Sequence, residues 1–187
     1  MARIHAVFRL MNLKDFIAFD PMSDCGNIIP KTPGNYLVTI RDISALPTSG
    51  HKVITQQFRG HELIYTGITK RDLNHRIWKS HISSHAGRST LRLTLGCLLG
   101  YTLIPRDKNS PNNGKVRFNA DDERELRDWM KKNLLFYFLP NDNPKEFESE
   151  LIKQFNPPLN LSENESPINR EFREDLSFQR SQRPWQI

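Results

Sequence analysis

Short runs of β-branched and aromatic residues indicate strands along this chain. The run 34–40, GNYLVTI, starts on a glycine and has the composition of a strand. Two more strands are predicted over 52–58 and 62–68, and the short Arg-Gly-His segment between them indicates a hairpin. Later, the run 134–140, LLFYFLP, predicts a short strand that is fully buried. These runs together predict a small sheet.

Helical spacing follows the third of these strands. Asp72 can cap a helix in which Leu73 and Ile77 lie one turn apart. A second helix is predicted from near Ser89, with a buried stripe of leucines at 91, 95, 98 and 99. Further helices are predicted over 121–133, 144–155 and 169–180, and one short helix around 12–19. This order of elements predicts an α+β fold.

The charge is distributed unevenly. The chain has 187 residues, of which 37% are hydrophobic and 26% charged, as in a packed globular protein. Residues 70–92 carry six cations and one anion, which accounts for nearly all of the formal net charge of +6. Residues 121–150 carry nine acids against five bases. The first segment favours a polyanionic partner, nucleic acid above all, and the second could supply carboxylates.

Secretion and membrane insertion are not indicated. Cys25 and Cys97 are too few for a disulfide framework and lack metal-ligand spacing. Charges interrupt the first twenty residues, and the longest uncharged stretch, 93–105, is too short to span a bilayer. We therefore expect a reduced, cytoplasmic protein.

Five features in a fixed order resemble one enzyme family. They are GNY at 34–36, YTG at 65–67, Arg76 on a predicted helix, Glu148 on a later helix, and PPLN at 157–160. This set resembles the GIY-YIG nucleases over residues 34–160. The resemblance implies a small, mainly antiparallel sheet of three to four strands flanked by helices, with residues 1–33 as a leader, an insert at 41–61 and a C-terminal extension at 161–187.

The resemblance also implies an activity, metal-dependent hydrolysis of phosphodiester bonds in DNA. Glu148 would bind one divalent cation, Mg²⁺ or Mn²⁺, and Arg76 would hold the scissile phosphate. Tyr36 would lie nearest the attacking water, and Tyr65 would orient the water or the phosphate. A tyrosine is a weak base at its usual pKa of about 10, but a nearby cation stabilises its phenolate. Which tyrosine accepts the proton stays open. Asn160 would close the core beyond Glu148.

The sequence departs from the family pattern in three places. Asn35 and Thr66 replace the isoleucines of the two tripeptides. Tyr36 and Tyr65 are 29 positions apart, so the insert must form an extra strand or loop. The family's helix histidine is expected one turn after the arginine, whereas His81 comes one residue late and either His85 or no histidine could take its place. His81 also continues the Leu73 stripe, which is equally typical of a buried structural histidine.

The remaining cations suit contacts with the nucleic-acid backbone. The alternative interpretation is that they form a solvated basic face without a ligand. These cations are Lys70, Arg71, Lys79, Arg88 and Arg92. Base-reading side chains could come from 41–61, from 105–118 or from the tail. A compact nuclease of this kind resembles the site-specific, restriction-type members of the family more than the homing enzymes, which carry a separate DNA-binding domain. Cutting both strands of a symmetric site would favour a homodimer. Two alternatives stay open: an inert nucleic-acid-binding module on the same fold, and a structure-specific nuclease of repair or mobile elements.

Overall fold

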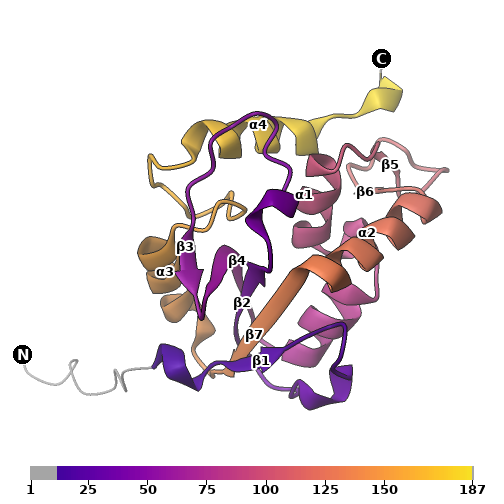
Figure 1. The fold of residues 1–187 in the computed structure, drawn as a ribbon. Helices are drawn as coiled ribbons and strands as arrows, with labels where there is room; N and C mark the ends of the chain where they lie inside the picture. Colours follow the sequence, from indigo (N-terminus) through magenta and orange to yellow (C-terminus); the bar gives the residue numbers. More distant parts are fainter. Residues whose placement is uncertain (1–11, 187) are drawn as a thin grey trace, which may run out of the picture.

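The computed structural model describes residues 12–186 and centres on one antiparallel sheet of five strands in the order β1-β7-β2-β4-β3 (Figure 1). The strands are β1 (Ile17–Phe19), β2 (Gly34–Ile40), β3 (Gln56–Phe58), β4 (His61–Thr69) and β7 (Leu134–Pro140). The α+β class and the antiparallel sheet are confirmed. The sheet has one strand more than the sequence predicted, because β1 adds to its edge by pairing with β7.

The central strand β2 is buried at every position, since it pairs with β4 on one side and β7 on the other while helices cover both faces. The predicted hairpin joins β3 to β4 through Arg59 and Gly60, with φ values of 51° and 83°. Positive φ at both central residues gives the turn the twist that the two strands require. The insert thus adds an edge strand and leaves the pairing of β2 with β4 intact.

Helices lie on both faces of the sheet (Figure 1). The helix α3 (Pro144–Phe155) packs on the face that presents Leu37, Leu63 and Tyr137. The opposite face presents Tyr36, Val38 and Phe136 to the larger apolar core. The helices that contribute to that core are η4 (His75–Ile82), α1 (Thr90–Leu98), α2 (Ala120–Asn133) and α4 (Arg170–Ser181).

Local sequence accounts for where these helices begin. The Ser89 hydroxyl accepts a hydrogen bond from the Arg92 N–H at the start of α1, and the Asn119 side chain caps α2 in the same way. Pro144 occupies the first turn of α3, where its missing N–H costs no helical bond. Asn156 ends α3 in a left-handed conformation, before the two prolines that block any continuation.

One sequence prediction was wrong in detail. The short helix expected around 12–19 is a single 3₁₀ turn followed by β1, because Ile17–Phe19 pairs with β7 at the sheet edge and buries Phe19. The loop after α1 contains a two-stranded ribbon, β5 (Ile104–Pro105) with β6 (Val116–Arg117). The 3₁₀ turns are η1 (Leu13–Asp15), η2 (Gly26–Ile28), η3 (Ile43–Ala45), η5 (Ala86–Arg88) and η6 (Pro184–Gln186).

Residues 1–11 of the expected leader lie outside the described residues. Within residues 12–186, no helix has both the length and the apolar character that crossing a membrane requires.

Candidate active site

The two tripeptides meet because their strands pair in a fixed register. Tyr36 of β2 lies directly opposite Gly67 of β4, and Val38 lies opposite Tyr65. Since side chains alternate along a strand, Tyr36, Tyr65 and Gly67 share one face of the sheet. The Tyr36 ring crosses the space above Gly67, where a β carbon would stand 2.6 Å from Cζ of the ring. Glycine at position 67 therefore makes room for the phenol of Tyr36.

The Tyr36 hydroxyl is the meeting point of two other predicted site residues. Arg76 donates a hydrogen bond from Nε to the phenol oxygen at 3.2 Å. Nε2 of His81 lies 2.8 Å from the same oxygen. His81, rather than the alternative His85, is thus the histidine beside Tyr36.

The late position of His81 is explained by the conformation of its helix. η4 is a π-helix over its eight residues, with a bond from the Ser83 N–H to the Trp78 carbonyl five positions back. In a π-helix, one turn takes about one residue more than in an α-helix. Residues five apart therefore share a face, which brings Arg76 and His81 together on Tyr36. The extra residue in the sequence is absorbed by the wider turn.

His81 is completely buried, and Nδ1 of its ring lies 2.7 Å from the Ser89 hydroxyl. Burial lowers the pKa of His81 well below its usual value, and the positive charges of Arg76 and Arg92 lower it further. The ring is therefore neutral near pH 7. Burial also raises the pKa of Tyr36 well above its usual value; Tyr65 adds to the rise and Arg76 opposes it.

The two departures from the tripeptide pattern are structural contacts. The side chain of Asn35 donates to the Pro144 carbonyl at 2.8 Å and accepts from Asn141 at 2.8 Å, so it ties β2 to the start of α3. The Thr66 hydroxyl donates to the Tyr36 carbonyl at 3.2 Å, which ties β4 to β2. Both residues are fully buried with these polar groups satisfied. Neither replacement touches the hydroxyl of Tyr36.

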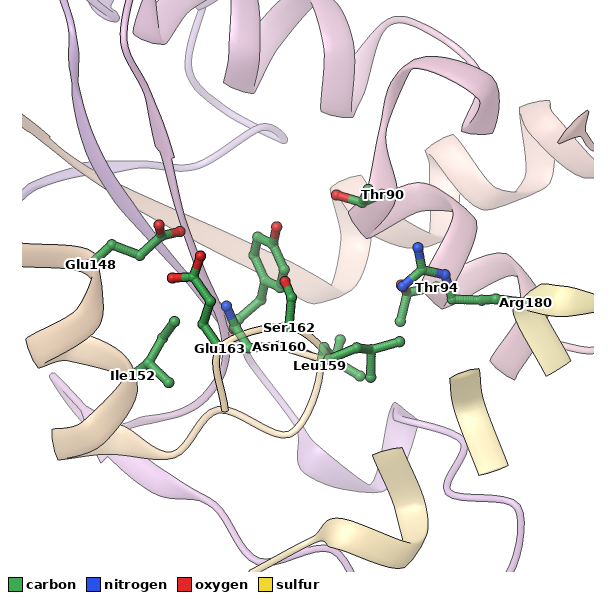
Figure 2. A pocket seen from close by; sticks show the side chains of 11 residues that line it. Thr90, Thr94, Glu148, Ile152, Leu159, Asn160, Ser162, Glu163 and Arg180 are labelled. Atoms are coloured by element: carbon green, nitrogen blue, oxygen red, sulfur yellow. The ribbon is translucent and has the colours of Figure 1, made fainter. Parts of the chain in front are cut away.

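A cavity of about 220 Å³ opens beside this arrangement (Figure 2). Its lining includes Tyr65, Glu148 and Asn160. Tyr36 has no exposed surface, whereas Tyr65 is partly exposed and reaches the cavity. The two rings are tilted against each other with centroids 6.2 Å apart. Tyr65 is therefore the tyrosine that faces solvent, and Tyr36 lies behind it.

Glu148 projects from α3 into this cavity and keeps 13% of its side chain exposed. Burial raises the pKa of Glu148; Lys145 opposes the rise, Glu163 adds to it and Arg76 opposes it again. The Lys145 ammonium contacts both carboxylates, 3.5 Å from Glu148 and closer to Glu163. Two carboxylates thus share a cation at one end of the cavity, within the electrostatic reach of Arg76.

Asn160 lines the cavity, but its amide is engaged by the backbone of β4. It accepts from the Thr66 N–H at 2.9 Å and donates to the Thr66 carbonyl at 2.9 Å. One residue earlier, the Leu159 N–H donates to the Ile64 carbonyl. This segment therefore pairs with β4 as a further strand would. The bonds hold the backbone between Tyr65 and Gly67, which is a positioning role.

The model of the GIY-YIG catalytic domain matches this chain over residues 34–182, and the match includes every residue of the site described above. The chain belongs to the GIY-YIG family. It is accordingly a nuclease of that family. No curated protein and no solved structure matches the chain.

The predicted backbone contacts of this GIY-YIG domain divide into two groups. Lys70, Arg71, Lys79 and Arg88 are exposed. Arg92 is completely buried, and its guanidinium pairs with Glu123 at 2.7 Å and donates to the carbonyls of His81 and Glu123. The expectation that Arg92 contacts phosphate was wrong. Arg92 lies on the inward-facing stripe of α1, and its side chain links α1 to η4 and α2. Removal of either Arg92 or Glu123 would leave the other charge buried and unpaired.

Three residues of the site were missed from the sequence. Glu163 and Arg180 line the cavity, and Ser89 contacts His81. The only sequence feature that could have pointed to Ser89 was its position at the start of a predicted helix. Glu163 lies in a loop with φ of 62° and Arg180 near the end of α4, so neither position belongs to a motif. In the described residues, no three His, Cys, Asp or Glu side chains are grouped as a multidentate metal centre.

Proposed function

We propose that this GIY-YIG protein is a divalent-metal-dependent DNA endonuclease. The observation that carries the proposal is the convergence of Tyr36, Tyr65, Arg76 and Glu148 from four elements around one cavity, which Tyr65 and Glu148 line. A phenol pair, a guanidinium and a carboxylate supply the three functions that phosphodiester hydrolysis requires. They are removal of a proton from water, neutralisation of the phosphate and coordination of a metal.

The donor set at Glu148 fits a hard cation such as Mg²⁺ or Mn²⁺. Mg²⁺ needs one or two protein carboxylates, keeps several waters and takes further oxygens from substrate phosphates. Glu148 and Glu163 already hold one positive charge, the Lys145 ammonium. Glu148 would hold the metal, with Glu163 available on the solvent side. A bound metal would supply neutralisation of the phosphate and of the leaving oxygen.

The proton of the attacking water would leave through the two tyrosines. Tyr65 reaches the cavity and Tyr36 lies behind it, so the water would contact Tyr65 first. Tyr65 would pass its own proton to Tyr36 as it takes one from the water. This requires a Tyr36 phenolate, which burial disfavours and positive neighbours favour. Arg76 and a metal at Glu148 are those neighbours.

Hydrogen-bond counting assigns a supporting role to His81. Ser89 has one hydroxyl proton, and its oxygen already accepts from the Arg92 N–H. If that proton goes to Nδ1 of His81, Ser89 and both ring nitrogens are satisfied, Nε2–H donates to the Tyr36 oxygen, and the proton of a neutral Tyr36 is left for Tyr65. The opposite tautomer would leave the buried Ser89 proton without an acceptor among the described residues. Tyr36 oxygen then accepts two bonds, from Arg76 and His81, and both stabilise its phenolate.

Cations around the β5–β6 ribbon would add to DNA binding. Arg88, Arg106 and Arg117 lie within electrostatic reach of His85. None of the three has a carboxylate within ion-pair distance in residues 12–186. Gly87 lets the ribbon approach, because a β carbon there would stand 2.7 Å from the Val116 carbonyl. With the exposed Lys70, Arg71 and Lys79, these side chains suit backbone phosphates.

We further propose that cleavage is site-specific and of the restriction type. One experiment with plasmid DNA tests both the endonuclease activity and its specificity. The protein is incubated with supercoiled plasmid and Mg²⁺, with and without a chelator. Discrete fragments support a restriction-type enzyme, whereas nicked circles or a smear support a less specific nuclease. DNA binding without cleavage in any divalent metal would contradict the proposal and favour an inert binding module.

A further inference from the structure

The cavity has two ends of opposite charge. Figure 2 shows Glu148 and Glu163 at one end, and Thr90, Thr94 and Arg180 at the other. The carboxylate end is the proposed metal position. The other end combines a guanidinium with the first turn of α1, which begins at Thr90. The N-terminus of a helix carries a partial positive charge and unpaired N–H groups. The second end therefore suits an anion.

Arg180 is placed there without a protein partner. It comes from the last turn of α4 (Arg170–Ser181). Its Nε–H is buried and has no hydrogen-bond partner, and its guanidinium has no carboxylate within ion-pair distance in residues 12–186. Burial lowers the pKa of Arg180, while Cys97 and Tyr65 oppose that effect. A guanidinium stays charged in proteins, so it has lost part of its hydration without compensation.

We propose that Arg180 and the Thr90 hydroxyl form a second phosphate subsite, which binds the backbone phosphate next to the one that is cut. The subsite rests on the proposed function for the identity of its ligand, a nucleic-acid strand. The scissile phosphate would lie at Arg76 and Glu148, and the strand would continue past Tyr65 to Arg180. An arginine with a free Nε–H can bind a phosphate through two parallel bonds, which fixes direction as well as position.

The first experiment uses inorganic phosphate and does not depend on cleavage. The Nε–H resonance of Arg180 in the full chain, assigned by its loss in Arg180→Lys, is followed by NMR as phosphate is added. A saturable shift that is absent with equal ionic strength of chloride is expected. A resonance that does not move, or that moves equally with chloride, would overturn the subsite.

The second experiment locates the phosphate on DNA. Duplexes with one neutral methylphosphonate at successive positions are bound in the presence of a chelator, so that no cleavage occurs. For the native protein, one substitution beside the cut position should weaken binding about tenfold or more. In Arg180→Ala that same substitution should have no further effect, whereas the control Arg170→Ala, from the exposed start of α4, should respond as the native protein does.

The two proposals fail separately. Native cleavage together with an Arg180→Ala variant that binds all duplexes normally would remove the subsite and leave the nuclease. A phosphate-dependent shift of Arg180 in a protein that cuts no DNA would leave the subsite and remove the nuclease.

Discussion

The ring of Tyr36 lies across Gly67 on the neighbouring strand, and a β carbon at position 67 would stand 2.6 Å from Cζ of the ring. This relationship explains why a tyrosine on one strand requires a glycine on the next. The same ring then receives Arg76 and His81 at its hydroxyl. Space at Gly67 is therefore a condition for the hydrogen bonds at Tyr36.

Gly67→Ala should displace the Tyr36 ring. The methyl group overlaps a buried side chain, so we expect a loss of about 1–3 kcal/mol in the free energy of unfolding and a large loss of cleavage. Urea unfolding of a double-mutant cycle measures this coupling. In a Tyr36→Ala background, the added methyl should cost much less. Equal costs in both backgrounds would show that the two residues do not compete for space.

Deleting Lys79 should be tolerated better than an ordinary helix deletion. Lys79 is exposed and lies between Arg76 and His81 in the π-helix η4. Its removal leaves the two residues four apart, which is the spacing of a regular α-helical turn. Both should still reach Tyr36. We expect a folded protein whose cleavage rate stays within about tenfold of native, measured by circular dichroism and plasmid cleavage.

The matched control is deletion of Asp128, which is exposed on the regular helix α2. That deletion turns the buried Met130 by about 100° away from the core, and unfolding or severe destabilisation is expected. If both deletions were equally damaging, the explanation that the wider turn of η4 accommodates one extra residue would be wrong.

Ser89→Ala should change the tautomer of His81. Without the hydroxyl proton, Nδ1 has no donor, so the Nε2–H form loses its advantage and Tyr36 loses a bond that stabilises its phenolate. The ¹⁵N chemical shifts of the His81 ring report the tautomer directly. We expect mainly Nε2–H in the native protein and a shift towards Nδ1–H in Ser89→Ala, with a lower maximal cleavage rate and little change in KM.

Two further variants separate this effect from the capping of α1. Ser89→Thr keeps a hydroxyl and should restore both the tautomer and the rate. Ser89→Asp keeps an acceptor for the Arg92 N–H but has no proton to donate, so it should retain the cap and lose the tautomer. A native ring with the Nδ1–H tautomer would refute the assignment.

The stability of the protein should fall below about pH 6.5 because of His81. The folded pKa is well below the usual value, since the ring is buried and faces Tyr36 on β2, Arg76 on η4 and Arg92 on α1. Between the two pKa values the unfolded chain binds more protons, so the free energy of unfolding drops by up to about 1.4 kcal/mol per pH unit as pH falls.

Urea unfolding at several pH values measures this slope. His81→Asn should flatten it, although the variant is less stable at neutral pH. The exposed His75 supplies the control, because His75→Asn should keep the native slope. An unchanged slope in His81→Asn would mean that the ring does not titrate as a buried neutral group.

The sequence predicted the residues that meet at Tyr36 better than it predicted how they meet. The strand β2 and the helix α3 follow from local composition, whereas the two tyrosines share a face through the register in which β2 pairs with β4. The spacing of His81 counted against it, because sequence patterns assume a regular α-helical turn. A π-helix is stabilised by tertiary contacts, here those of Arg76 and His81 with Tyr36, and no local signal reveals it.

Charge alone misled the sequence analysis at Arg92. A cation among other cations suggested a contact with phosphate, but its position on the α1 stripe directs it into the core, where Glu123 from a distant helix pairs with it. Arg180 is the opposite case, because it was not predicted as a site residue and yet lines the cavity. It lies 104 positions after Arg76 and belongs to no motif, so its place at the cavity depends on how α4 packs on α1.

The most direct test of the account is metal-dependent cleavage by Glu148→Gln beside Glu150→Gln, which alters an exposed carboxylate on the same helix. Single-turnover rates on plasmid DNA are measured across a Mg²⁺ titration. We predict that Glu150→Gln behaves as the native protein does, and that Glu148→Gln loses at least about 100-fold in rate at every Mg²⁺ concentration. Native cleavage by Glu148→Gln, or native cleavage that persists in a chelator, would contradict the account.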